Sequence, residues 1–462
     1  MLWPVCTTVR RHVSSSLLAV LLCSMLCLLS TSATFAKGSS QIRALSIVHG
    51  GRYATQWRQS IAPTDVQCRV ILRVPCYSPQ EMRNAYNLTP VLDAGFAGLG
   101  QTIVIIDSFG SPTVEEDLEQ FDADYGIPNP PSFQVLSPFG TVPFDANNAE
   151  EAGWAIETSL DVQWAHAMAP AANIVLLTSP VSETEGIQGM PQFLALEQYA
   201  LDHHLGQIIS QSWGTTENTL FTPDGRKIVN DFETFYQKAA LAGVTVLASA
   251  GDSGSANPDV NLSTYPFPTV IYPASSPWVT AVGGTSLHAD TNGNYQYETV
   301  WNDGIGSATG GGISQTFAEP LYQRLLPPDD QKLLDGHRGI PDIAYNADPS
   351  TAIPVFLSFL PGAGNQGYFL IGGTSEGSPQ WAGLVADANQ YVGHPLGFLN
   401  PYLYLLGASK ITASLVFHDI TSGNNAQPPV SGYDATPGWD AVSGWGTPIV
   451  QPLLQTLAQL RE

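Results

Sequence analysis

The chain has 462 residues, enough to bury one large hydrophobic core or two smaller ones. Its hydrophobic share of 44% excludes a disordered composition, and its formal net charge of −23 argues against a nucleic-acid partner. Only 12% of the residues are charged and most of these are acidic. That balance fits a secreted protein, and one that works in acid, where most of the negative charge would be titrated.

The N-terminus has the pattern of an export signal. A basic start precedes the apolar stretch of residues 16–29, which is short for a membrane span, and small residues end at Ala36. We expect residues 1–36 to be removed and the product to be secreted without stable membrane association. An uncleaved anchor is the alternative. Cys68 and Cys76 are then the only pair of cysteines in an exported chain, and we expect a disulfide between them.

Short apolar runs with β-branched residues alternate with helix-like stretches along the chain. The expected strands are residues 102–107, 173–179, 207–212, 244–250, 278–284 and 367–373, and the expected helices lie around 150–169, 191–204, 229–242 and 376–392. Several of these strands are almost continuously apolar, as buried parallel strands are. The alternation predicts a mostly parallel central sheet covered by helices on both faces, in one domain over residues 77–462. Residues 37–76 form a short N-terminal segment.

Ser375 is the candidate nucleophile. It lies between an expected strand and an expected helix, in the motif GTSEG of residues 373–377, where a hydroxyl would need a base. The motif matches the G-x-S-x-G elbow of histidine-dependent esterases, so an esterase is one interpretation. In that class the acid and then the histidine follow the serine, and here only His394 and His418 lie downstream.

The remaining candidate bases are carboxylates. In the region where a subtilisin would carry its catalytic histidine, this chain has only His166, His203 and His204. Each of them lies in helix-like sequence. Glu157 and Asp161 are four residues apart on an expected helix and share one face. Two adjacent carboxylates in an apolar setting titrate as a pair and hold one proton over a raised pH range. From spacing alone, a solvated acidic pair on a helix surface is the alternative.

Eight motifs, taken together and in order, resemble the sedolisin family, the serine-carboxyl peptidases. They are ETSLDVQ at residues 157–163, SWG at 212–214, ASAGDSG at 248–254, YPASSPWVTAVGGT at 272–285, GGGIS at 310–314, PDIAYNADP at 341–349, GGTSEGSP at 372–379 and TPGWDAVSGWGTP at 436–448. The resemblance implies a subtilisin-like three-layer fold in which a glutamate replaces the base histidine. It also implies a secreted endopeptidase that acts at acid pH on protein or peptide substrates. We expect a monomer.

The resemblance assigns the catalytic roles. Ser375 would be the nucleophile, Glu157 the base that takes its proton, and Asp161 the group that orients Glu157. Asp252 would point a protonated carboxyl at the developing oxyanion, with the Ser375 amide as a second donor. Without the resemblance, Asp252 would be read as a turn-forming residue between two glycines.

The same comparison implies a substrate-binding surface, with Asp107 as a supporting acid. A strand ending at SWG would pair with the substrate backbone, and three consecutive glycines would let a peptide approach closely. The expected substrate-binding residues are Ser212, Trp213, Gly214, Gly310, Gly311 and Gly312.

The C-terminal motif resembles the family's calcium site. One structural Ca²⁺ would take the carboxylates of Asp419 and Asp440 and the backbone carbonyls of Ile420, Thr436 and Gly438, all oxygen donors. Relatives usually have glycine where this chain has Thr436, but a carbonyl ligand needs no particular side chain.

One departure concerns the N-terminus. Family members usually carry a long prosegment, whereas only residues 37–76 separate the expected signal from the start of resemblance. We therefore expect a reduced or absent prosegment. A catalytically silent secreted binding protein with this fold is the non-enzymatic alternative.

Overall fold

The computed structural model describes residues 55–57, 61–304, 306–362 and 365–460, all within one compact unit of residues 42–462. The expected export signal, residues 1–36, lies outside the described residues. In the described part of the chain, no helix combines the length and apolarity needed to cross a membrane.

The largest sheet has eight strands, and most of them are parallel. Its strand order is β10-β9-β7-β5-β2-β4-β3, with β13 also pairing with β9. Only β10 runs antiparallel to its neighbour. The strands are β2 Thr102–Ser108, β3 Phe133–Leu136, β4 Asn173–Ser179, β5 Ile208–Gln211, β7 Thr245–Ser249, β9 Thr280–Ala289, β10 Tyr295–Val300 and β13 Ile343–Asn346.

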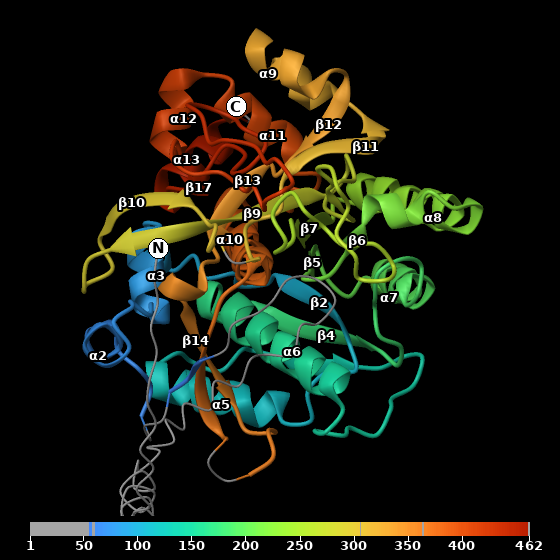
Figure 1. The fold of residues 1–462 in the computed structure, drawn as a ribbon. Helices are drawn as coiled ribbons and strands as arrows, with labels where there is room; N and C mark the ends of the chain where they lie inside the picture. The colour runs from blue at the N-terminus through green and yellow to red at the C-terminus, as the bar shows by residue number, and fades with distance from the viewer. Residues whose placement is uncertain (1–54, 58–60, 305, 363–364, 461–462) are drawn as a thin grey trace, which may run out of the picture. The chain divides into compact units, whose positions relative to one another are not determined.

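Helices cover both faces of this sheet (Figure 1). Along β2, Ile103 and Ile105 belong to the core beneath α6 and α10, whereas Val104 and Ile106 belong to the core beneath α7 and α8. Alternate side chains of a strand point to opposite faces, so a strand that is apolar throughout is buried on both. The covering helices are α6 Ala149–Met168, α7 Met190–Asp202, α8 Pro223–Leu241 and α10 Gly377–Val392. The predicted three-layer architecture is confirmed.

One expected strand leads into a different sheet. The sequence pattern predicts residues 367–373 as one of the strands of the mostly parallel sheet. In the structure, β15 (Gly367–Ile371) pairs antiparallel with β14 (Ile353–Leu357) and with β1 (Thr55–Gln56). A continuous apolar run reports burial and not the direction of the neighbouring strand. The sequence pattern therefore found the strand but not its partners.

The described residues that precede Tyr77, 55–57 and 61–76, contribute to the same compact unit. Trp57 is buried and donates its backbone N–H to Tyr368 O at 2.8 Å. The structure joins Cys68 and Cys76 in the expected disulfide. The helix α2, Asp65–Ile71, begins with a capping box at Thr64.

The other helices are shorter than these four covering helices. The helices are α3 Pro79–Ala85, α4 Thr89–Asp93, α5 Val114–Tyr125, α9 Pro328–Leu334, α11 Asn400–Gly407, α12 Lys410–Val416 and α13 Val450–Gln459, and the 3₁₀ turns are η1 Glu217–Leu220, η2 Leu321–Leu325, η3 Pro349–Thr351 and η4 Thr374–Glu376. The remaining strands are β6 Thr215–Thr216, β8 Ile271–Tyr272, β11 Gly312–Ala318, β12 His337–Ile340, β16 Phe417–His418 and β17 Thr447–Pro448.

Candidate active site

The acidic pair lies inside the protein. Helix α6 begins after Asn148, whose side chain accepts a hydrogen bond from Glu150 N–H at 3.1 Å. From Ala152 to its end the helix is buried, and the side chains of Glu157 and Asp161 are 0% exposed. The structure therefore excludes a solvated pair on a helix surface. The two carboxyl groups therefore share one face of a helix in the protein interior, where adjacent ionisable groups interact strongly.

The turn that carries Ser375 packs against the helix of the acidic pair. Strand β15 ends at Ile371, and two glycines lead into η4, which contacts α6. Gly373 has a φ of +134°, a conformation that favours glycine, and a Cβ there would lie 2.6 Å from Asp252 Oδ2. Ser375 is buried at the N-terminal end of α10, as expected for a serine on a strand-to-helix turn.

Asp252 contacts this turn directly. It follows β7, and its Oδ1 accepts hydrogen bonds from the Thr374 N–H and the Thr374 hydroxyl, both at 2.7 Å. A carboxyl that served only to form its own turn would bond to neighbouring amides. Here these two donors come from a residue 122 positions further along the chain. The structure thus places Asp252 beside the candidate nucleophile.

One small cavity lies between the ends of β5 and β7, the start of β8 and this turn. Its lining residues are Ser212, Trp213, Ser249, Gly251, Asp252, Ile271, Thr374 and Ser375. The cavity lies beyond the carboxyl ends of β5 and β7, where parallel sheets commonly bind ligands. The expected substrate residues Ser212 and Trp213 therefore adjoin the expected catalytic residues Asp252 and Ser375.

No histidine in the described part of the chain lines this cavity. His166 is fully buried, with its Nε2 atom 3.2 Å from Asp122 Oδ2. His418 stacks on Tyr295 with ring centroids 3.6 Å apart, and burial lowers its pKa to about 4. These contacts give the two side chains structural roles. The geometry supports a carboxylate base over a histidine base.

The SWG segment follows β5 directly. Trp213 is buried, and its ring packs against Phe193 on α7 at 4.5 Å and Phe232 on α8 at 6.0 Å between centroids. The tryptophan therefore ties this segment to the two helices on one face of the sheet. Its expected role in substrate binding stays a prediction. Asp107 lies at the end of β2 and is fully buried.

The three consecutive glycines allow close packing, but the neighbouring atoms come from this chain. A Cβ on Gly310 would collide with the Ala250 carbonyl, and one on Gly311 would lie 2.5 Å from Ala441 O. A Cβ on Gly312 would lie 2.7 Å from the Tyr433 ring. All three glycines are buried. Their expected role in substrate binding stays a prediction.

Sequence reasoning missed two residues of the site. Thr374 links Asp252 to the nucleophile turn, and Gly251 N–H donates to its hydroxyl at 3.1 Å. Glu376 follows Ser375, is 0% exposed, and accepts a hydrogen bond from Asn346 Nδ2 at 3.1 Å. Burial raises the pKa of Glu376 well above its ordinary value. Their position next to Ser375 was the available signal, but it did not distinguish them from other turn residues.

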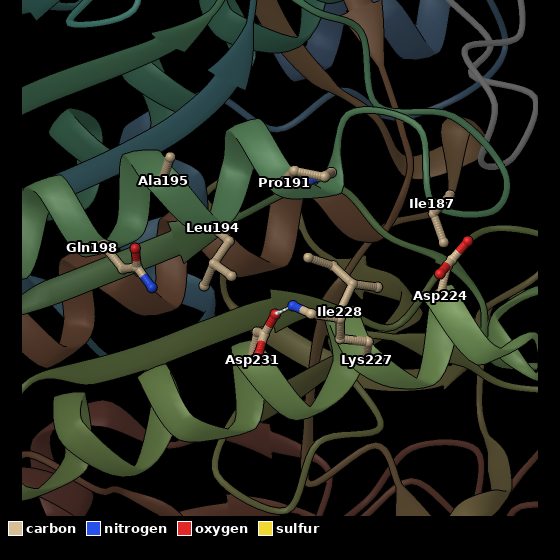
Figure 2. A pocket seen from close by; sticks show the side chains of 9 residues that line it. All are labelled: Ile187, Pro191, Leu194, Ala195, Gln198, Asp224, Lys227, Ile228 and Asp231. Carbon is tan, nitrogen blue, oxygen red and sulfur yellow. Dashed lines mark hydrogen bonds and ion pairs between the residues drawn. The ribbon is translucent and has the colours of Figure 1, made fainter.

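A second pocket lies between α7 and α8 (Figure 2). Its lining combines apolar side chains, Leu194 and Ile228 among them, with a Lys227–Asp231 ion pair whose Nζ and Oδ2 atoms are 2.6 Å apart. None of the residues expected to act on or bind substrate belongs to it. The ion pair joins residues four apart on one helix, as exposed surface pairs commonly do.

Four of the five expected calcium ligands adjoin each other in two pairs, and Ile420 follows Asp419 directly in the chain. Gly438 N–H donates to both carboxylate oxygens of Asp419, at 3.1 and 3.0 Å. Thr436 N–H donates to Asp440 Oδ2 at 2.9 Å. Thr436 is not among the described non-glycine residues with a positive φ, so its backbone suits an ordinary side chain.

This donor set fits a hard divalent cation. Asp440 is 2% exposed, and burial raises its pKa to about 7. Burial also raises the pKa of Asp419. A cation would offset the cost of burying the Asp440 charge while also binding the exposed Asp419 carboxylate, and two carboxylates with peptide carbonyls form the all-oxygen set that Ca²⁺ prefers. In the described residues, no group of three or more His, Cys, Asp or Glu side chains is placed to hold a metal ion, so backbone carbonyls would have to complete this site.

Comparison with known proteins gives consistent relatives. Over 403 residues the chain is 37% identical to kumamolisin from Bacillus sp. (strain MN-32), a match covering 86% of this chain and 65% of kumamolisin. It is 32% identical to sedolisin from Pseudomonas sp. (strain 101), covering 80% of this chain and 59% of that protein. The chain therefore spans less than two thirds of these relatives' lengths. No protein-family model matches it.

A solved structure shows the same likeness in three dimensions. Pseudomonas sedolisin, described as a serine-carboxyl proteinase in complex with pseudo-iodotyrostatin, superposes with a TM-score of 0.70 at 28% identity. The superposition covers 84% of this chain and 99% of the sedolisin chain. Sequence motifs, relatives and fold agree, and the chain belongs to the sedolisin family.

Proposed function

We propose that the protein is a secreted, monomeric, serine-type endopeptidase that hydrolyses protein or peptide substrates at acid pH. One observation carries the proposal. The turn of Ser375 shares a cavity with Asp252 and packs against α6, the helix that carries the buried Glu157 and Asp161. A nucleophile, a pair of carboxyls to move its proton and an acid to bind an oxyanion are together the groups that acyl transfer requires.

The proposed reaction proceeds through an acyl-enzyme. Ser375 Oγ attacks the carbonyl carbon of the scissile bond, and its proton passes to Glu157, which Asp161 orients. The carbonyl oxygen becomes an oxyanion that accepts hydrogen bonds from the Asp252 carboxyl and the Ser375 amide. As the C–N bond breaks, Glu157 returns the proton to the leaving amine. Water then attacks the acyl carbon by the same route and releases Ser375.

Acid pH follows from the protonation states that these roles require. Asp252 can donate to an oxyanion only when protonated, whereas Glu157 must be ionised to accept the serine proton. Both conditions hold over a limited window, which we place near pH ~3–5. The carboxyls around the site are buried. Their burial supports placing this pH window above the pH range in which a solvated pair of carboxyls would titrate.

We also propose one structural Ca²⁺ at Asp419, Ile420, Thr436, Gly438 and Asp440, supported by the donor set described above. The ion would screen the Asp419 and Asp440 charges and tie the two C-terminal segments together. Its contribution would be to stability and not to the reaction itself.

A fluorophosphonate label tests the proposal directly. It should modify Ser375 in the active protein and fail to modify Ser375→Ala, while the wild type cleaves denatured protein with an acid optimum. Peptide hydrolysis by Ser375→Ala at the wild-type rate would refute the mechanism. Loss of activity to a histidine-directed inactivator would favour the esterase interpretation. An unlabelled Ser375 without hydrolysis would favour a silent binding protein.

A further inference from the structure

Thr374 makes three hydrogen bonds that connect the nucleophile turn to the end of β7. Its N–H and its hydroxyl both donate to Asp252 Oδ1 at 2.7 Å, and its hydroxyl oxygen accepts from Gly251 N–H at 3.1 Å. Thr374 is 1% exposed and Asp252 is 3% exposed. These bonds therefore form where water competes little for the donors and acceptors.

The bonds determine where a proton on Asp252 can reside. A carboxyl oxygen has two lone-pair positions, and two donors from Thr374 occupy those of Oδ1. A proton on Oδ1 would face both of these hydrogens. The protonated form therefore carries its hydrogen on Oδ2, the oxygen next to Gly373 in the turn that leads to Ser375.

We propose that Thr374 is a positioning residue that fixes the Asp252 carboxyl and keeps its proton on Oδ2, the oxygen on the side of the Gly373 turn. The inference rests on the proposed function, in which Asp252 donates to that oxyanion. Other charged groups face the same region. Glu376 on η4 interacts electrostatically with Asp252, and α6, the helix that carries Glu157 and Asp161, packs against η4. As carboxyls, these groups influence the charge at Asp252, whereas Thr374 supplies neutral donors to one defined oxygen.

This role predicts a specific change in the pH profile. Donors on Oδ1 favour the ionised carboxylate, so removal of the Thr374 hydroxyl lets Asp252 keep its proton to higher pH. Thr374→Val should move the alkaline limb of kcat upward by about half to one pH unit. Its kcat at the optimum should fall by about 10-fold, because the proton is no longer confined to Oδ2 and the carboxyl is less well aligned. Thr374→Ser, which keeps the hydroxyl, should restore both values.

The experiment measures kcat against pH, normalised to active sites titrated with the fluorophosphonate. Thr245→Val serves as a matched control, because Thr245 is buried on β7 and its hydroxyl donates to Gly397 O at 2.6 Å. It should lower the melting temperature without moving the alkaline limb. Thr374→Ala gives the same test if the valine variant does not fold.

The outcomes separate this inference from the proposed function. If Ser375→Ala is inactive but Thr374→Val keeps the wild-type limb, the positioning role is wrong and the proposed function stands. A limb that moves to lower pH would show that Oδ1 carries the proton and donates to the hydroxyl, which also overturns the assignment. If Ser375→Ala remains active, the proposed function itself fails.

Discussion

Replacing Glu233 with glutamine should remove part of the pH dependence of this protein's stability. Glu233 lies on α8, and its Oε1 accepts a hydrogen bond from the Tyr272 hydroxyl at 3.2 Å. Burial raises the Glu233 pKa from 4.5 to about 7, so the folded protein binds this proton more tightly than the unfolded chain does. The resulting stabilisation is complete below pH 4.5 and is lost as the pH rises through about 7.

The size of the effect follows from the pKa difference. One pKa unit corresponds to about 1.4 kcal/mol, so the full shift would amount to about 3 kcal/mol of unfolding free energy at neutral pH. Part of the Glu233 side chain remains in contact with solvent, which screens the charge. We therefore expect about 2 kcal/mol. Glutamine does not ionise and keeps an oxygen that can accept from Tyr272, so the variant should lose this pH dependence without losing the hydrogen bond.

Urea unfolding of wild type and Glu233→Gln between pH ~4 and ~7 measures the difference in slope. The inactive Ser375→Ala background prevents self-digestion during the measurement. Glu115→Gln is a suitable control because Glu115 lies exposed on α5, and it should follow the wild-type curve. Parallel loss of stability in Glu233→Gln and wild type across this range would refute the assignment of a raised Glu233 pKa.

Three further results are expected. Glu157→Gln and Asp161→Asn should each lower kcat by about 10³-fold or more, because a catalytic unit fails when one member is lost; wild-type rates in Glu157→Gln would refute the mechanism. Asp252→Asn should be slower but keep its residual activity to higher pH, because an amide donates at every pH; an unchanged alkaline limb would contradict this. EGTA and Asp440→Ala should both lower the melting temperature, and if neither changes it the calcium site is wrong.

The sequence predicted the layers of the fold well because burial leaves a local signal. Strands such as β2 are apolar throughout, which indicates helices on both faces whatever the rest of the chain does. Strand β15 shows the limit of that signal. Its residues are as apolar as those of β2, yet it pairs antiparallel with β14 in another sheet. Strand partners depend on contacts distant in sequence, and no local pattern encodes them.

In the candidate site, too, local sequence predicted some residues and could not predict others. Glu157 and Asp161 could be found from spacing because they share one helix. Asp252 could not, since its local sequence fits an ordinary turn and only the eight motifs together pointed to it. The bonds that distinguish it come from Thr374, 122 residues away. Hydrogen bonds between residues so far apart in sequence can be identified only from the folded structure.

The buried carboxyls connect the proposed chemistry to the proposed environment. Burial raises the pKa values of Glu183, Glu197 and Glu376 well above that of a free glutamate. Each of these glutamates binds its proton more tightly in the folded protein, as Glu233 does. Each therefore stabilises the fold in acid, and this stabilisation is lost as the pH rises. The carboxyls that we propose as catalytic lie in equally buried positions, on α6 and at the end of β7. Acid conditions that leave Asp252 protonated therefore also favour the fold, so activity and stability should both decline as the pH approaches neutrality.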